Sequence, residues 1–265
     1  MRKAAFHWPE YAIEAVNLGL FMVSAAAFAS LLRHPSSPLA AAVGSLMPQP
    51  LQRAPMGLAM GLTAAAIIYS PLGRRSGAHM NPSVTLTFLR LGKIRPLDAA
   101  AYIAAQFVGG AAGILAATLL LRGLPSHPAI NYVATVPGAA GLTIAFAGET
   151  AISFGMMLMV LSVSNTRQLA RFTGAFAGVL IAIYITFEDP LSGMSMNPAR
   201  TLGPALLSHT ARWLWIYFTA PLLGMLLAAE LYVRTIGAQR VRCAKLHHPA
   251  AGPCIFRCRF MENPA

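Results

Sequence analysis

Two copies of one motif decide the fold: Ser76-Gly-Ala-His-Met-Asn-Pro-Ser-Val-Thr-Leu86 and Ser192-Gly-Met-Ser-Met-Asn-Pro-Ala-Arg-Thr-Leu202. Seven of their eleven positions are identical, at an offset of 116 residues. Each Asn-Pro pair opens an apolar run that is too short to cross a bilayer. Proline suits the first turn of a helix, because the N–H that it lacks would have no helical partner there. We therefore predict two half-helices, over residues 80–91 and 196–207.

The rest of the sequence has the composition of a membrane protein. Apolar residues make up 56% of the chain and charged residues 11%, against roughly 25% charged in a typical soluble domain. The net charge of +12 comes from basic residues between the apolar runs and not from one basic patch. We therefore expect a lipid bilayer as partner and no nucleic acid. Six segments come near the about 20 apolar residues that a span requires: 12–32, 55–70, 97–121, 142–162, 172–187 and 212–236.

The chain divides into two similar halves. Each half holds three predicted spans and one half-helix, and Glu14 in the first span corresponds to Glu149 in the fourth. Because three is odd, the second half enters the membrane inverted, and the two half-helices meet near the midplane. The predicted fold class is an all-α membrane protein with six transmembrane helices and two re-entrant half-helices. The expected domains are an N-terminus over 1–10, a channel domain over 11–236 (repeats about 11–122 and 142–236) and a basic tail over 237–265.

Basic residues predict the orientation. One side of the predicted bundle carries 15 Lys and Arg residues, counting both termini, and the other side carries 5. Loops rich in Lys and Arg stay in the cytoplasm. We expect a multi-pass protein of the inner (plasma) membrane with both termini cytoplasmic.

The doubled Asn-Pro motif resembles the signature of the aquaporin family, also called major intrinsic proteins. The resemblance covers roughly residues 10–236 and includes His79, Arg200 and the paired glutamates. It implies a homotetramer of right-handed six-helix bundles, each with a pore for water or small uncharged solutes. One departure is Asn81-Pro82-Ser83, where the family usually has Asn-Pro-Ala; Asn197-Pro198-Ala199 keeps the usual pattern.

Asn81, Asn197 and Arg200 are the main candidate pore residues. A file of water needs hydrogen-bond donors at its centre, and side-chain amides supply them. Each half-helix also presents roughly +0.5 charge at its N-terminus, which disfavours cations, hydronium included. Alternatively, each asparagine only caps its own half-helix. Arg200 would be a fixed cation beside the pore, or a side chain that extends to the outer interface.

The resemblance places Arg200 in a selectivity filter and implies its other members. They are Ile185, Met194 and either Met60 or Gly61. Water-selective members usually carry His at the position of Ile185 and Phe at the position of Met60 or Gly61. An apolar wall beside one arginine suits a solute such as glycerol, with carbon on one side and hydroxyls on the other.

Other family marks favour water. Glycerol facilitators typically have Asp and a basic residue where this chain has Thr201 and Ala205. Tyr217 and Phe218 resemble an aromatic pair of water channels. The permeant therefore stays open between water and glycerol.

Three polar residues and the tail have structural interpretations. Glu14 and Glu149 are expected to accept hydrogen bonds from the re-entrant loops, with a proton relay as the alternative. His79 is expected to line the cytoplasmic vestibule or bond loop backbone, with a pH gate as the alternative. The tail is expected to be disordered beside anionic lipid.

No cofactor or metal site is expected. In the tail, the spacing of His247, His248, Cys254 and Cys258 matches no strong zinc pattern. No cluster of catalytic groups is evident, so an enzyme is disfavoured. The alternative function is a secondary transporter, because inverted repeats with broken helices also build carriers.

Overall fold

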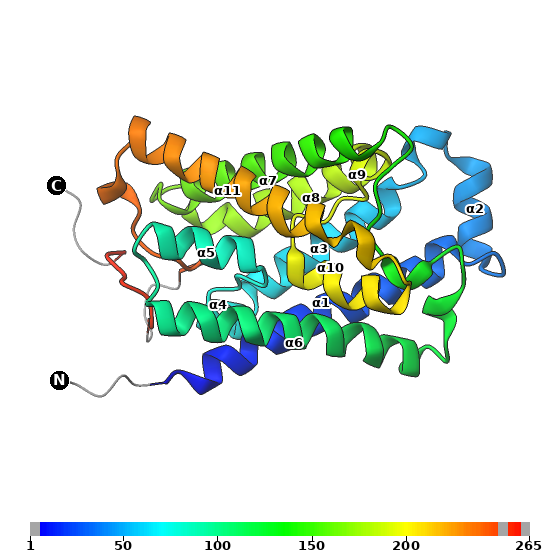
Figure 1. Cartoon of the computed structure of the whole chain (residues 1–265), viewed down its shortest axis with the longest axis horizontal. Coiled ribbons are helices and arrows are strands. Elements are labelled where there is room, and N and C mark those ends of the chain that lie inside the picture. Colours follow the sequence, from blue (N-terminus) through cyan, green and yellow to red (C-terminus); the bar gives the residue numbers. More distant parts are fainter. Residues whose placement is uncertain (1–5, 249–253, 261–265) are drawn as a thin grey trace.

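The computed structural model describes residues 6–248 and 254–260, and these residues form a bundle of helices (Figure 1). The α-helices are α1 Trp8–Arg33, α2 Pro38–Leu46, α3 Ala54–Tyr69, α4 Pro71–Ser76, α5 Pro82–Arg90, α6 Pro96–Leu120, α7 Leu142–Ser164, α8 Thr173–Phe187, α9 Asp189–Ser192, α10 Pro198–Leu207 and α11 Leu214–Thr235. Short 3-10 turns lie at Gln49–Leu51, Leu124–Ser126, Asn131–Val133, Ala170–Phe172, Ala211–Trp213 and Ala238–Arg240.

Within the described chain, six helical segments are long and apolar enough to cross a membrane. They correspond to the six predicted spans: Trp8–Arg33, Gln49–Tyr69, Pro96–Leu120, Leu142–Ser164, Ala170–Phe187 and Ala211–Thr235. The half-helices α5 and α10 begin at Pro82 and Pro198, directly after the two asparagines. Secondary structure therefore agrees with the sequence pattern at every predicted span and half-helix.

The two halves pack in equivalent pairs. Helix α1 packs along α6 in the first half, and α7 packs along α11 in the second. Helices α3 and α8 join the halves, and each half-helix contacts a long helix of the other half, α5 with α11 and α10 with α6. A Cβ at Gly61 would lie 2.3 Å from the carbonyl oxygen of Gly178, so these two glycines permit the close approach of α3 and α8.

The bundle has two distinct ends. Helix α1 begins and α11 ends at the same end of the bundle, which we call the terminal side (Figure 1). Helix α2 lies at the opposite end, the distal side (Figure 1). Both Asn-Pro turns lie between these ends, because α5 runs from its asparagine toward the terminal side and α10 runs toward the distal side (Figure 1).

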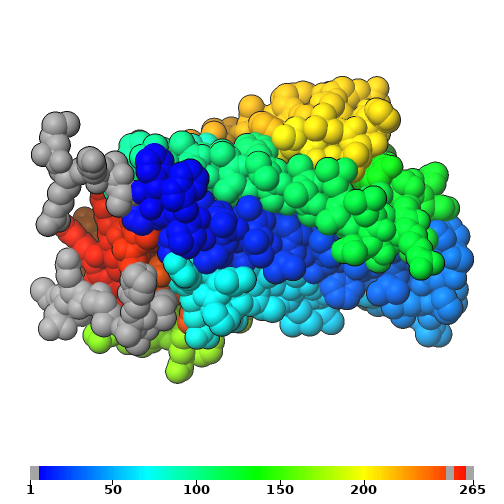
Figure 2. All heavy atoms as spheres, turned by 90° about the horizontal axis from the view of Figure 1, so that it is seen from below, coloured from blue at the N-terminus to red at the C-terminus, as the bar shows by residue number. Residues whose placement is uncertain are grey.

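The described part of the C-terminal tail differs from the predicted disordered segment. Residues 241–248 and 254–260, which we call the tail, lie against the terminal end of the bundle (Figure 2). Val241 and Ala244 are fully buried, and Leu246 and Phe256 are 7% and 5% exposed. The reason is that the tail carries apolar side chains among its basic ones, and the apolar side chains pack against the terminal side of the bundle. Of the predicted tail over 237–265, residues 249–253 and 261–265 lie outside the described residues.

Candidate functional site

Glu14 organises the first re-entrant loop. Its carboxylate accepts a hydrogen bond from the Ser76 hydroxyl at 2.7 Å. It also accepts the backbone N–H groups of His79 at 3.1 Å and Met80 at 2.7 Å. The chain before α5 is not helical, so these N–H groups have no intrahelical acceptor. A fully buried glutamate takes that place.

Glu149 does the same for the second loop. It accepts the Ser192 hydroxyl at 3.1 Å, and the N–H groups of Ser195 at 2.5 Å and Met196 at 2.8 Å. Equivalent atoms of the two repeats thus make equivalent bonds. The geometry supports the structural interpretation of Glu14 and Glu149.

These bonds hold the loops in a backbone conformation that most residues avoid. Ala78 and Met80 have φ angles of 55° and 49°, and Met194 and Met196 have 44° and 55°. The left-handed region costs a residue with a Cβ roughly 1–2 kcal/mol. The same strained positions occur at the same places in both loops, so the strain belongs to the turn that aims each asparagine.

Two buried tyrosines complete the support of the loops. The Tyr102 hydroxyl donates to the carbonyl of Ser76 at 2.7 Å, and the Tyr217 hydroxyl donates to that of Ser192 at 2.6 Å. Both rings are fully buried. Tyr217, which resembled a mark of water channels, therefore supports a loop. Sequence reasoning missed Tyr102, although it lies 115 residues before Tyr217, within one residue of the repeat offset of 116.

Each asparagine caps its own half-helix. The Oδ1 atom of Asn81 accepts the Ser83 N–H at 2.8 Å. The Oδ1 atom of Asn197 accepts the N–H groups of Ala199 at 3.0 Å and Arg200 at 3.2 Å. Pro82 and Pro198 occupy the first helical positions and are buried. The Ser83 hydroxyl is buried and has no hydrogen-bond partner among the described residues.

The asparagines also bond across the pseudo-symmetry axis. The Asn81 amide donates to the carbonyl of Met196, and the Asn197 amide donates to that of Met80, both at 2.7 Å. A side-chain amide has two N–H donors. Each asparagine therefore uses one donor to lock the opposite loop and has a second to offer to the space between the half-helices. Capping and pore lining are compatible functions of the same side chain.

A cavity of about 150 Å³ passes between the two asparagines. It extends from Arg33 and Asp189 on the distal side to Leu246 of the tail on the terminal side. The predicted filter residues that line it are Met60, Ile185, Met194 and Arg200. Gly61, the alternative to Met60, packs against Gly178 of α8 instead.

Arg200 lies beside the cavity and is held by a partner that the sequence did not indicate. Its guanidinium donates a hydrogen bond to the hydroxyl of Thr135, which is 1% exposed. Thr135 belongs to the irregular connection between α6 and α7. Asp189, also on the cavity wall, accepts a hydrogen bond from Arg53 at 2.9 Å. The distal mouth therefore holds a fixed cation beside an ion pair.

Near that mouth, Glu188 follows the last residue of α8. It is 9% exposed, and both carboxylate oxygens lack a hydrogen-bond partner among the described residues. Burial raises the pKa of Glu188 to about 8. The side chain is therefore largely protonated at neutral pH and adds little charge to the distal mouth.

His79 lies at the terminal end of the cavity and is covered by the tail. Its Nε2 atom is 2.8 Å from the carbonyl oxygen of Ala244, and its ring stacks on Phe88 and Phe256 with centroids 5.2 and 5.3 Å away. A carbonyl only accepts, so Nε2 carries the proton. His79 is 3% exposed and does not face an open vestibule. His79 thus lines this end of the cavity, as expected, but the tail takes the place of an open vestibule.

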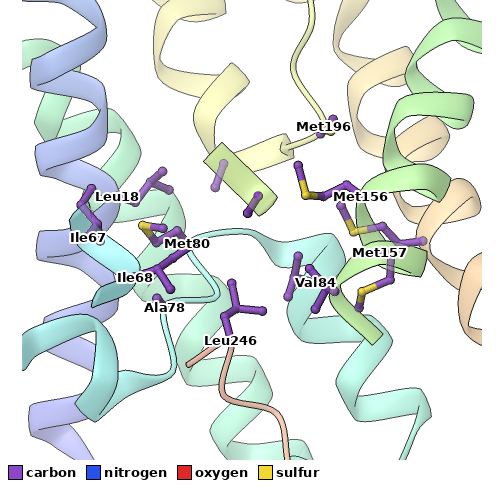
Figure 3. Packing of buried hydrophobic residues seen from close by; sticks show 14 of the residues in the cluster. Leu18, Ile67, Ile68, Ala78, Met80, Val84, Met156, Met157, Met196 and Leu246 are labelled. Carbon is purple, nitrogen blue, oxygen red and sulfur yellow. The ribbon is translucent and has the colours of Figure 1, made fainter. Parts of the chain in front are cut away.

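The tail reaches the cavity itself. The Leu246 N–H donates to the carbonyl of Gly77 at 3.1 Å, and the Leu246 side chain lines the cavity. Figure 3 shows Leu246 between Ala78 and Ile68 on one side and Val84 on the other. No regular pattern in this part of the sequence predicts the contact.

The tail also gathers the chain's three cysteines around one histidine. One ligand atom from each of Cys243, His248, Cys254 and Cys258 lies within 4.8 Å of the others. The prediction of no metal site considered sequence spacing alone and omitted Cys243. The folded tail brings together four groups that could hold a metal ion, which their spacing along the sequence did not indicate.

Comparison with known proteins agrees with this geometry. The family model described as Major intrinsic protein matches residues 3–232. Aquaporin NIP3-1 of Zea mays is 39% identical over 174 residues, which are 65% of this chain and 56% of the relative. Aquaporin NIP1-2 of Arabidopsis thaliana is 34% identical over 183 residues, which are 67% of this chain and 61% of the relative. The chain thus spans less than two thirds of the length of these relatives.

Among solved structures, the aquaglyceroporin from Plasmodium falciparum has a TM-score of 0.73 with this chain at 21% identity. The match covers 89% of this chain and 99% of that chain. This likeness confirms the predicted fold class. The family model covers all six membrane-length helices nearly in full and both Asn-Pro turns. The chain is therefore a multi-pass membrane protein that belongs to the major intrinsic protein family.

Proposed function

We propose that this protein is a passive channel for water and small uncharged solutes. The observation that carries the proposal is the cavity that passes between the Asn81 and Asn197 amides. Family membership supports it, and the relatives named above are aquaporins. A carrier would need a charged substrate or ion site at the midplane, whereas the groups there are two neutral amides.

The pore geometry favours neutral solutes over cations. The free N–H of each asparagine is a donor for a water or hydroxyl oxygen. Two half-helix N-termini, each equivalent to roughly +0.5 charge, face this point. Arg200 adds a full positive charge toward the distal mouth. A neutral molecule passes these groups by exchanging hydrogen bonds, while a cation meets repulsion at both places.

Glycerol-sized solutes are included in the proposal. Met60, Ile185 and Met194 give the cavity an apolar wall near Arg200. The features that favoured water lie elsewhere: Thr201 and Ala205 are buried in α10, and Phe218 stacks on Phe107 at 5.7 Å. Their identity therefore has little direct influence on what fits the cavity.

Stopped-flow light scattering on proteoliposomes tests the proposal. The reconstituted protein, treated with a metal chelator, is exposed to an osmotic water step and to an inward glycerol gradient. We expect both fluxes to exceed those of empty liposomes and to rise linearly with the gradient, without increased proton leak. Saturable, proton-coupled uptake would indicate a carrier. Water flux without glycerol flux would refute the proposal that glycerol-sized solutes pass the filter. The proposed channel function would then hold for water alone.

Assembly and orientation belong to the same proposal. We propose a homotetramer in the plasma membrane with both chain ends cytoplasmic, because the 15 basic residues predicted on one side fit the positive-inside rule. Native mass spectrometry in detergent should give four times the mass of one chain. A reporter that is active only in the cytoplasm, fused after residue 265, should be active.

A further inference from the structure

Four metal-binding side chains meet in the tail. The Sγ atoms of Cys243 and Cys254 are 3.6 Å apart, and Cys258 Sγ is 3.1 Å from His248 Nε2. One donor atom from each of the four lies within 4.8 Å of the others. Cys243 is 3% exposed, and the other three are partly buried. The cluster is therefore compact and largely shielded from solvent.

These distances suit a metal ion with tetrahedral coordination. Zn–S bonds of about 2.3 Å and Zn–N bonds of about 2.0–2.1 Å place neighbouring ligand atoms roughly 3.5–3.8 Å apart in a tetrahedron. The Cys243–Cys254 separation of 3.6 Å lies within that range, and the Cys258–His248 separation of 3.1 Å is shorter than the range. Three thiolates and one imidazole are a soft ligand set that selects Zn²⁺ among common divalent ions.

The ligands bracket the residues that cover the pore. Ala244 and Leu246, which contact His79 and Gly77, lie between the ligands Cys243 and His248. In the second part of the tail, Phe256 stacks on His79 and lies between Cys254 and Cys258. An ion held by these four side chains would close both segments over the pore mouth.

The tail is also attached to both repeats. On the first repeat, the Arg257 N–H donates to the carbonyl of Lys93 at 2.9 Å. On the second, the Arg242 N–H donates to the Asn165 side chain at 2.7 Å. The tail therefore crosses the mouth from one repeat to the other.

We propose that Cys243, His248, Cys254 and Cys258 bind a Zn²⁺ ion that holds the tail across the terminal mouth of the pore. Metal binding is then coupled to the order of the tail, because the four ligands converge only in this conformation. The ion favours a closed channel, and its removal favours an open one. The gating consequence rests on the proposed channel function; the metal site does not.

Cobalt spectroscopy tests the metal site without any transport assay. The full chain is purified with a reductant and an affinity tag free of His and Cys, and Co²⁺ is titrated. All three cysteines of the sequence belong to the cluster, so thiolate-to-cobalt bands report this site alone. We expect one ion per chain, tetrahedral d–d bands, and bleaching by one equivalent of Zn²⁺.

Neighbouring histidines supply the matched control. His248→Ala and Cys258→Ser should each lose the tetrahedral spectrum, whereas His247→Ala should keep it, because His247 is outside the cluster. Monodisperse elution of every variant shows that it is folded. Absence of thiolate bands in the reduced wild type, or equal loss in His247→Ala and His248→Ala, would overturn the site. So would a Cys243–Cys254 disulfide, in place of a bound ion, that persists in the presence of the reductant.

Flux measurements test the closure. At free Zn²⁺ of about 100 times its Kd, binding to the closed form alone raises the closed-to-open ratio about 100-fold. Wild-type and His247→Ala proteoliposomes should therefore pass solute with chelator and lose most of that flux with Zn²⁺. His248→Ala should pass solute under both conditions. Equal wild-type flux with and without Zn²⁺ would overturn the closure and leave the channel function intact.

A full-length variant separates a closed channel from a protein that is not a channel. Leu246→Ala/Phe256→Ala removes the side chains that cover the mouth and leaves the four ligands in place. It should conduct even with Zn²⁺ bound. If this variant and the chelated wild type both fail to conduct, the proposed channel function and the closure fail together, while the cobalt spectrum still decides the metal site.

Discussion

Replacing Glu149 by glutamine should destabilise the protein through one specific hydrogen bond. Oε1 of Glu149 accepts from Ser192 and Ser195, and Oε2 accepts the Met196 N–H. A glutamine has one acceptor oxygen and one NH2 donor. If its oxygen keeps the position that serves two donors, its NH2 faces the N–H of Met196, and that buried N–H loses its partner.

The magnitude follows from this loss. A buried donor without a partner costs about 1–3 kcal/mol of unfolding free energy. Met196 is 6% exposed, so water cannot readily replace the carboxylate. For a chain of this size, about 2 kcal/mol corresponds to a fall in Tm of roughly 4–8 °C. Met196 also carries the carbonyl that Asn81 bonds, so the misplaced loop should also reduce solute flux.

Thermal unfolding followed by tryptophan fluorescence in detergent measures the effect. Glu230→Gln is the control, because its ion pair with Arg90 is between exposed side chains and is worth about 0–1 kcal/mol. Glu14→Gln should resemble Glu149→Gln, since its bonds are equivalent. If Glu149→Gln unfolds at the same temperature as Glu230→Gln, Glu149 is not the acceptor that maintains the loop.

Three further predictions concern the cavity and its distal mouth. Ile185→His should narrow the cavity and cut glycerol flux more than water flux in chelator-treated proteoliposomes; equal reductions would contradict the filter assignment. Arg200→Val should raise proton leak, measured with an entrapped pH dye, while Thr135→Val, which removes only a partner of Arg200, should raise it less. Glu188→Gln should unfold with less pH dependence than wild type. Burial raises the pKa of Glu188 from 4.5 to about 8, so between these pH values the folded state binds a proton that the unfolded state has lost. The stability of the wild type therefore falls as the pH rises from 4.5 to about 8. If Tm varies with pH in the same way in wild type and in Glu188→Gln, the raised pKa of Glu188 is refuted.

The spans and half-helices could be predicted because their signals are local. Apolar length determines which segments cross a membrane, and an Asn-Pro pair both caps and starts a helix. The repeat then relates the two loops, so Glu14 predicts the role of Glu149. These inferences need no knowledge of distant contacts.

Other parts of the site depend on contacts that no local pattern encodes. Met60 and Gly61 are adjacent, and the packing of Gly61 on Gly178 decides that Met60 lines the cavity. Thr135, the partner of Arg200, lies in an irregular connection. Cys243 joins the cluster only because the tail turns back toward the pore.

The crossed asparagine bonds restrict how this molecule can change shape. Asn81 holds the loop of the second repeat, and Asn197 holds the loop of the first. Rocking one repeat against the other, as carriers do, would break both bonds at once and leave buried donors and acceptors unpaired. The centre of the pore should therefore behave as a rigid ring, and conformational regulation is confined to its two ends.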